Sequence, residues 1–139
     1  MRASWSKPVA RTKKSKGEVA EIRFAAVAIA YGLALARPWG DSEKFDFITG
    51  RTRNLWRVQV KSTSAKGPSG GYAVNACTQG KSYTEDEVDF LAAYVFPANT
   101  WYIIPIRALR GAKMLLLHPE SRRSSGKWEA FREAWRLFT

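Results

Sequence analysis

The chain has 139 residues, enough for one hydrophobic core, and its 45% hydrophobic and 13% aromatic content excludes a disordered polypeptide. Its 23 Lys and Arg outnumber 12 Asp and Glu, and the formal charge of +11 favours a polyanionic partner without distinguishing DNA from RNA. The longest apolar run, residues 24–36, is too short to span a bilayer, and a single Cys and a single His exclude an intrachain disulfide and a Cys/His zinc cluster. We therefore expect one cytoplasmic domain with no membrane segment.

Residues 1–14 are rich in basic side chains, and we expect this segment to be flexible, either as a solvated tail or as a clamp on nucleic acid. A single domain would then span residues 15–139. From Ser15 to Leu33 apolar residues recur with helical spacing, which predicts a long helix. Ser15 and Glu18 fit the Ser-x-x-Glu capping box that opens many helices.

Glu18 has two interpretations that the sequence leaves open. It lies one turn before Ile22 and Ala25 of the apolar pattern, so its side chain would fall on or beside the buried face and point at a sheet. It is then either a metal ligand or only a capping residue, and both roles hold if the glutamate is shared. Glu21 is the backup carboxylate, with a solvated position as its simpler interpretation.

Two paired strands are predicted next. Residues 44–49 and 55–62 are rich in aromatic and β-branched side chains, and residues 50–54 form a polar turn between them. A hairpin centred between Thr52 and Arg53 fits this arrangement.

The hairpin fixes which side chains share a face. Asp46 lies opposite Gln59, and because strand side chains alternate, Lys61 shares their face while Val58 and Val60 point to the other. A slip of one residue would drive Asp46 and Lys61 into the core, so the register is constrained.

This polar face suits phosphate chemistry. Asp46, Gln59 and the carbonyl of Val60 offer the hard oxygen ligands that Mg²⁺ prefers. The ion would polarise a phosphoryl oxygen and lower the pKa of a bound water, while Lys61 would orient that water or stabilise charge in the transition state. The simpler alternative is a half-exposed hairpin with ordinary polar residues on its outer face.

The rest of the chain completes a mixed sheet. Residues 72–76 predict a third strand, and residues 89–96 and 101–105 predict a hairpin of buried strands around a Pro-Ala-Asn-Thr turn. Residues 113–117 predict a last strand. A closing helix is predicted over residues 127–138, with a stripe that packs in the core or at a dimer interface: Trp128, Phe131, Trp135 and Phe138.

Candidate phosphate contacts are basic residues in the N-terminal region, in and after the hairpin turn, and in the Gly/Ser/Pro loop of residues 65–71. They are Lys13, Lys14, Lys16, Arg51, Arg53, Arg57 and Lys66. Such contacts would make binding sensitive to salt.

The order of Glu18, then Asp46, then Gln59-Val60-Lys61 resembles the PD-(D/E)XK nuclease superfamily, whose core carries an early helical Glu, an Asp on one strand and D/E/Q-x-K on the next. The resemblance is closest to the group I intron-associated, homing-endonuclease-like branch, which has a junction-resolvase-like fold. It is carried by residues 16–21, 44–48, 56–63, 83–90 and 101–105. Two positions depart from the usual pattern: Phe45 replaces a Pro, and Gln59 replaces an acid.

The resemblance implies an α/β fold with a restriction-endonuclease-like core: an N-terminal helix, a central mixed β-sheet with hairpins and a C-terminal helix. It implies a Mg²⁺-dependent DNA endonuclease, with Mn²⁺ able to substitute, whose site contains Glu18, Asp46, Gln59 and Lys61. The alternatives are a four-way junction resolvase and a non-catalytic nucleic-acid-binding module on the same fold.

We also expect a homodimer or higher oligomer of a prokaryotic or phage-encoded protein, because one site cuts one strand at a time. A surplus of aromatic side chains, including Trp128 or Trp135, would mark the interface.

Overall fold

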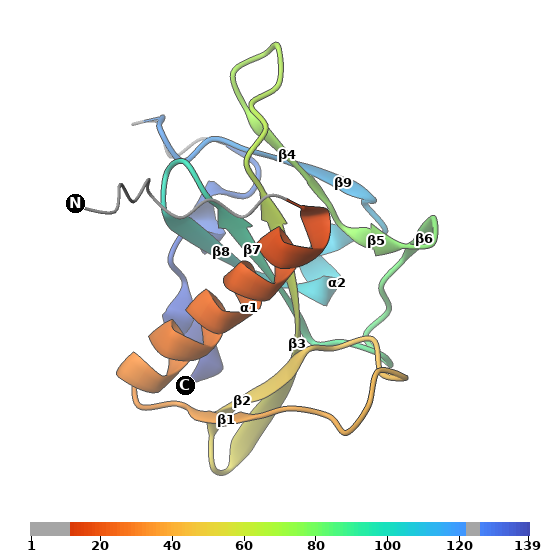
Figure 1. Cartoon of the computed structure of the whole chain (residues 1–139), viewed down its shortest axis with the longest axis vertical. Helices are drawn as coiled ribbons and strands as arrows, with labels where there is room; N and C mark the ends of the chain where they lie inside the picture. The colour runs from red at the N-terminus through yellow and green to blue at the C-terminus, as the bar shows by residue number, and fades with distance from the viewer. Residues whose placement is uncertain (1–11, 122–125) are drawn as a thin grey trace, which may run out of the picture.

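A five-stranded mixed sheet forms the centre of the fold in a computed structural model, which describes residues 12–121 and 126–139 (Figure 1). Its strand order is β1-β2-β3-β7-β8, in which β3 and β7 run parallel and the other neighbours antiparallel. The strands are β1 (Ala34–Ala36), β2 (Phe47–Arg51), β3 (Asn54–Thr63), β7 (Phe90–Val95) and β8 (Thr100–Pro105). The predicted mixed sheet is confirmed.

The β2–β3 hairpin has the predicted register. Phe47 pairs with Val58, and the N–H of Asp46 donates to the carbonyl of Val58 at 2.8 Å, although β2 itself begins only at Phe47. Gly50 is required beside the turn, because its φ is +141° and a Cβ there would lie 2.1 Å from the carbonyl oxygen of Asn54. The turn therefore has little freedom to shift the strands.

Helix α1 (Lys13–Ala30) begins before the predicted start. Thr12 is the N-cap: its Oγ1 accepts from the N–H of Ser15 at 3.0 Å, and Ser15 Oγ accepts from the N–H of Thr12 at 3.1 Å. The predicted capping box of Ser15 with Glu18 is therefore wrong, because Ser15 serves as the partner of Thr12. The predicted flexible segment lies outside the described residues as far as residue 11.

The buried face of α1 differs from the prediction. Ala20, Phe24 and Ala28 are buried, whereas Ile22 is 69% exposed. A helix turns about 100° per residue, so Ile22 lies about 200° from Ala20, on the opposite side. The buried face of α1 is determined by the Phe24 ring, which packs into an aromatic cluster with Phe47, Trp101, Trp135 and Phe138.

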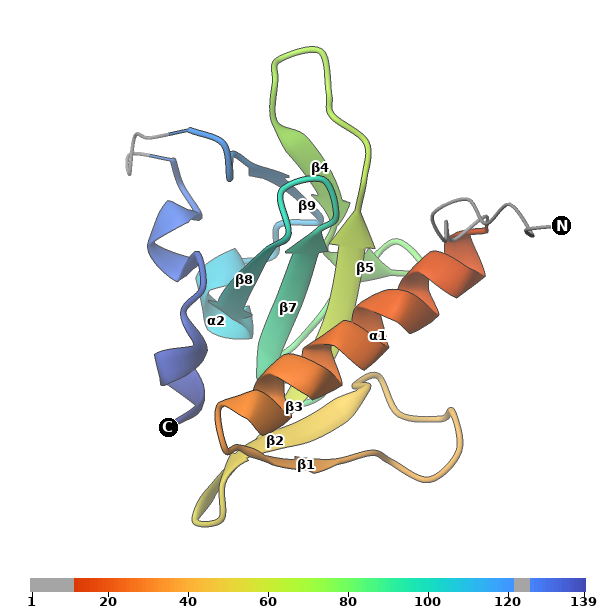
Figure 2. The same ribbon diagram turned by 60° about the vertical axis from the view of Figure 1, so that its left-hand side comes forward.

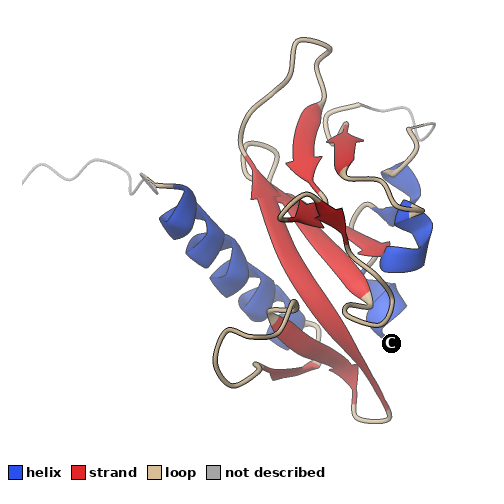
Figure 3. Ribbon diagram, turned by 90° about the vertical axis from the view of Figure 1, so that its right-hand side faces the viewer, coloured by secondary structure: helices blue, strands red, loops and turns tan. Residues whose placement is uncertain are grey.

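Each face of the sheet has its own core, and α1 covers one of them (Figures 2 and 3). Along β7, Phe90, Ala92 and Tyr94 face α1, and the alternate residues face the second layer. That layer contains β4 (Tyr72–Asn75), β9 (Met114–Leu117) and the short α2 (Ile106–Leu109). The predicted strands at 72–76, 89–96, 101–105 and 113–117 are confirmed within a residue or two. A small hairpin of β5 (Cys77–Thr78) and β6 (Lys81–Ser82) was not predicted.

The predicted C-terminal helix is replaced by two short 3₁₀ turns, η1 (Glu129–Phe131) and η2 (Trp135–Phe138). Between them Arg132 is extended and Glu133 has a φ of +50°, because this segment pairs with β8 instead of continuing a helix. The N–H of Glu133 donates to the carbonyl of Trp101 at 2.7 Å, and Glu133 Oε1 accepts from the N–H of Trp101 at 2.8 Å.

The C-terminal aromatic side chains fill the core. Trp128, Trp135 and Phe138 are buried, with Trp128 and Trp135 only 4% and 3% exposed. The expectation that Trp128 or Trp135 marks an interface therefore loses its basis. No helix in the described ranges is long and apolar enough to cross a membrane.

Candidate active site

Asp46 is held against β3 by the backbone. The N–H of Val60 donates to Asp46 Oδ2 at 2.8 Å, and the N–H of Asp46 donates to the carbonyl of Val58 at 2.8 Å. The first of these bonds uses Oδ2 and leaves Oδ1 for another partner. Asp46, Gln59 and Lys61 then line one cleft of about 400 Å³, as the predicted register requires.

Two segments wall this cleft. One is the β1–β2 connection, which contributes residues 41–44, and the other is the β5–β6 hairpin with the residue that follows it, Tyr83. Lys61 Nζ donates to the carbonyl of Cys77 at 3.3 Å and lies 5.6 Å from the centroid of the Tyr83 ring. Two-residue strands carry no periodic signal, so nothing in the sequence pattern indicates that this hairpin reaches Lys61.

Burial disfavours charge on both central groups. Burial raises the pKa of Asp46, although the Val60 hydrogen bond and the positive charge of Lys61 oppose the shift. Burial also lowers the pKa of Lys61, against the attraction of Asp46. A bound cation would favour the ionised carboxylate, and a phosphate would favour the ammonium.

The two helical glutamates differ in position. Measured from buried Phe24, Glu18 lies about 120° round the helix, while Glu21 lies only about 60° away. Glu18 is exposed, yet it borders a cavity whose lining also includes Leu35 of β1 and Phe47 of β2, so it lies beside the sheet and is open to water. Its role as a metal ligand stays a prediction, and it lines a cavity of about 580 Å³ together with Glu21.

Glu21 is the helical carboxylate that shares a cavity with Asp46, a space of about 250 Å³ also lined by Arg37. Burial raises the pKa of Glu21, and the negative charge of Asp46 raises it further. Arg37 Nη2 forms an ion pair with Glu21 Oε1 at 3.3 Å. The backup carboxylate of the sequence analysis thus comes closer to the predicted site than the first choice.

Hard oxygen donors suited to a divalent cation gather here. Among the described residues no group of three or more His, Cys, Asp or Glu side chains converges on a metal position, so a cation would also need Gln59 or the Val60 carbonyl. Asp46 and Glu21 are two partly buried carboxylates of the same cavity, each with a raised pKa. A divalent ion would offset both penalties, so the residues fit Mg²⁺.

The predicted basic contacts lie at two ends of the molecule. Lys13, Lys14 and Lys16 are at the start of α1, where Lys16 Nζ donates to Ser64 Oγ at 3.1 Å just beyond β3. Arg51 and Arg53 are exposed at the β2–β3 turn, which lies at the other end of the sheet (Figures 1 and 2). Lys66, in the β3–β4 loop, forms an ion pair with Glu120 at 2.8 Å.

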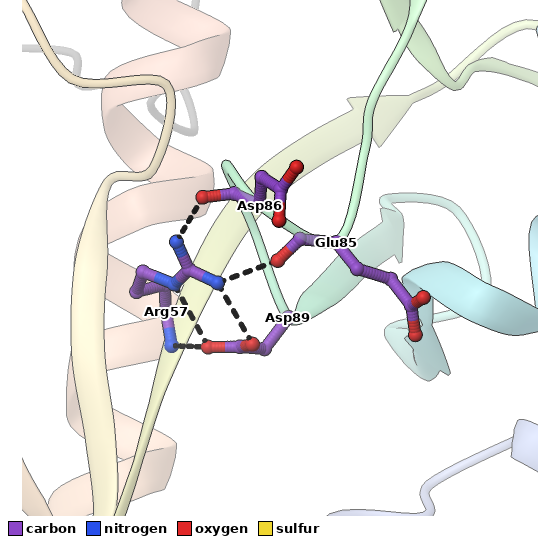
Figure 4. Close-up of polar contacts among 4 residues, drawn as sticks. All are labelled: Arg57, Glu85, Asp86 and Asp89. Atoms are coloured by element: carbon purple, nitrogen blue, oxygen red, sulfur yellow. Dashed lines mark hydrogen bonds and ion pairs between the residues drawn. The ribbon is translucent and has the colours of Figure 1, made fainter.

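The guanidinium group of Arg57 is bound by neighbouring residues of the protein itself (Figure 4). Its Nε and Nη2 donate to the Asp89 carboxylate at 3.0 and 3.1 Å, and its Nη1 and Nη2 donate to the carbonyls of Asp86 and Glu85 at 2.5 and 2.7 Å. Asp89 also accepts from the backbone N–H of Arg57 at 2.8 Å. All three guanidinium nitrogens thus donate hydrogen bonds within the protein, which disfavours the predicted contact of Arg57 with a DNA phosphate.

Asp89→Ala should lower the free energy of unfolding by about 2–3 kcal/mol, because it removes charge-assisted bonds at the start of β7. Burial works against the charge on Asp89, but the bonds from Arg57 outweigh it and hold the pKa of this carboxyl below its ordinary value. The contribution is therefore complete at neutral pH and is lost as the pH falls through the lowered pKa. Urea unfolding measures the effect. Glu85→Ala is the control, since only its backbone carbonyl contacts Arg57; an equal loss in both variants would contradict the assignment.

The helix-covered mixed sheet, with a carboxylate, an amide and a lysine across one hairpin, defines a restriction-endonuclease-like nuclease. The family model for the PD-(D/E)XK endonuclease matches residues 11–138, and the chain belongs to this family. Its members generally use a divalent metal ion.

One solved structure, titled as that of a bacterial homing endonuclease, I-Ssp6803I, is 27% identical to this chain. It superposes with a TM-score of 0.77, over 91% of this chain and 90% of that chain. No curated protein matches the sequence. The predicted fold and the predicted homing-endonuclease-like resemblance are confirmed.

Proposed function

We propose that this endonuclease hydrolyses phosphodiester bonds of DNA with Mg²⁺, or with Mn²⁺ in its place, in the manner of a homing endonuclease. The observation that carries the proposal is the Val60-to-Asp46 hydrogen bond, which holds a carboxylate in the cleft that contains Gln59 and Lys61. Asp46, Gln59 and the Val60 carbonyl would hold the ion, with Glu21 or Glu18 completing its ligands.

Each group has a defined task. When bound, the ion would polarise the scissile phosphate and lower the pKa of a water molecule. Lys61, a half-buried ammonium beside Asp46, orients the attacking water or neutralises the negative charge that builds up around phosphorus. Gln59 offers an oxygen without adding a negative charge, which lessens repulsion between the cleft and a polyanion.

The basic residues supply affinity. Lys13, Lys14, Lys16 and Lys66 lie at one end of the protein, and Arg51 and Arg53 at the other. Contacts with the phosphate backbone at both ends would make DNA binding fall steeply as salt rises. We place the protein in the cytoplasm of a prokaryotic cell, encoded by the cell or by a phage.

Cleavage of supercoiled plasmid in Mg²⁺ and in EDTA tests the proposal. Nicked or linear product in Mg²⁺ alone is expected, and product that persists in EDTA would overturn the metal dependence. No product with either Mg²⁺ or Mn²⁺, despite tight binding, would favour a non-catalytic binding module. Preference for a four-way junction over a linear duplex would favour a resolvase.

Glu21→Gln should reduce the cleavage rate by about tenfold or more, and Glu18→Gln should reduce it less. The physical reason is that Glu21 shares the cavity of Asp46, whereas Glu18 is exposed in the neighbouring space. Titration of the rate with Mg²⁺ should show that Glu21→Gln needs a higher Mg²⁺ concentration to reach half of its maximal rate, because the ion binds more weakly. If Glu18→Gln instead reduced the rate more than Glu21→Gln, Glu18 would be the principal helical ligand.

Double-strand cleavage should require a homodimer or a higher oligomer. The chain has one Asp46/Gln59/Lys61 site, and a two-fold axis would present one site to each strand. Light scattering with and without DNA measures the assembly. A protein that stays monomeric in both states yet cuts both strands in one binding event would contradict this expectation.

A further inference from the structure

Two contacts of the Lys61 ammonium come from the β5–β6 hairpin and the residue that follows it. Nζ donates to the carbonyl of Cys77, at the start of β5, and faces the ring of Tyr83, just after β6. Tyr83 is 6% exposed and belongs to the core cluster beneath the sheet, so its ring is fixed by packing. The carbonyl and the aromatic ring both present negative charge density to the cation.

Lysine has a long, flexible side chain, and a catalytic ammonium works only if it is held near the reacting group. Neither contact of Lys61 neutralises it, because a carbonyl and a ring carry no formal charge. The ammonium is thus oriented while its charge stays available to a phosphate. Asp46 alone would pull Nζ toward the metal ligands.

We propose that Tyr83 is a positioning residue for Lys61, whose ring face, together with the Cys77 carbonyl, holds the ammonium at the phosphate end of the cleft. The inference rests on the proposed function and adds a residue to it. The working part is the ring and not the hydroxyl. Burial raises the pKa of Tyr83 to about 12, so the hydroxyl stays protonated near neutral pH and cannot serve as a base.

Two substitutions at Tyr83 test the ring. Tyr83→Phe keeps the ring and should cleave saturating plasmid at the wild-type rate. Tyr83→Leu removes it and should lower that rate by about tenfold, with little change in DNA affinity measured in EDTA. Trifluorophenylalanine at position 83 keeps the shape of Phe but weakens the negative face, and it should lower the rate even if the Leu variant fails to fold.

Tyr72→Leu is the matched control. Tyr72 is also buried, and Lys66 Nζ lies 5.8 Å from the centroid of its ring, but this pair does not line the cleft. Tyr72→Leu should leave the rate at saturating plasmid unchanged. An equal loss of rate in both Leu variants would mean that core packing, not the contact with Lys61, sets the rate.

The Lys61→Ala background decides whether Tyr83 acts through Lys61. Tyr83→Leu should cause no further loss there, because the group it positions is already gone. A further tenfold loss would overturn the proposal, as would a normal rate for the Leu and trifluorophenylalanine variants or a slow Phe variant. If Lys61→Ala itself cleaves normally, the proposed function of the site fails instead, which is a separate result.

Discussion

Asp46→Ala should abolish cleavage, with the rate at saturating plasmid falling by about a thousandfold or more. The substitution removes the carboxylate that sits between the Val60 amide and the cleft, and with it the anchor for a cation. Folding and most of the DNA affinity should survive, because the basic surface supplies binding.

A plasmid cleavage time course and a binding assay in EDTA, run on the same preparation, measure the two effects. Asp86→Ala is a suitable control, because only its backbone carbonyl makes a contact with Arg57. Undiminished cleavage by purified Asp46→Ala would rule out the site assignment.

Lys61→Ala should lower the cleavage rate by about 10²–10³-fold while changing DNA affinity much less, because its charge acts mainly in the transition state. Lys61→Arg should restore only part of the rate. The planar guanidinium is larger than an ammonium and does not fit the space between the Cys77 carbonyl and the Tyr83 ring in the same way.

Single-turnover rates at several enzyme concentrations separate binding from chemistry for these variants. If both bind weakly but cleave normally once the plasmid is saturated, Lys61 is a phosphate anchor and has no part in the chemical step.

The sequence was most informative where the signal is local. The β2–β3 hairpin follows from alternation along two strands and a turn that only glycine at position 50 allows, and this register puts Asp46, Gln59 and Lys61 in one cleft. Asp46 precedes Gln59 by 13 residues and Lys61 by 15, so a single hairpin is enough to bring them together.

The sequence was least informative where tertiary contacts choose between alternatives. Alanines and isoleucines occur all round α1, and only the aromatic cluster around Phe24 decides which side is buried and thus that Glu21 is less exposed than Glu18. The helical spacing of Trp128 and Trp135 was equally ambiguous, because pairing of Glu133 with Trp101 breaks the helix. The Cys77 carbonyl and the Tyr83 ring, which contact Lys61, come from a short segment with no periodic pattern.

The segment around Glu133 also covers the outer edge of strand β8. Strand β8 is the last in the sheet order, and an uncovered last strand is a ready template for pairing with another chain. Glu133 hydrogen-bonds both the backbone N–H and the carbonyl of Trp101, and Arg132 pairs with Tyr102 in an isolated antiparallel β-bridge. Loss of this segment would therefore expose a hydrophobic strand that can recruit its counterpart from a second molecule, and the foreseeable outcome is aggregation through strand addition rather than a simple loss of stability.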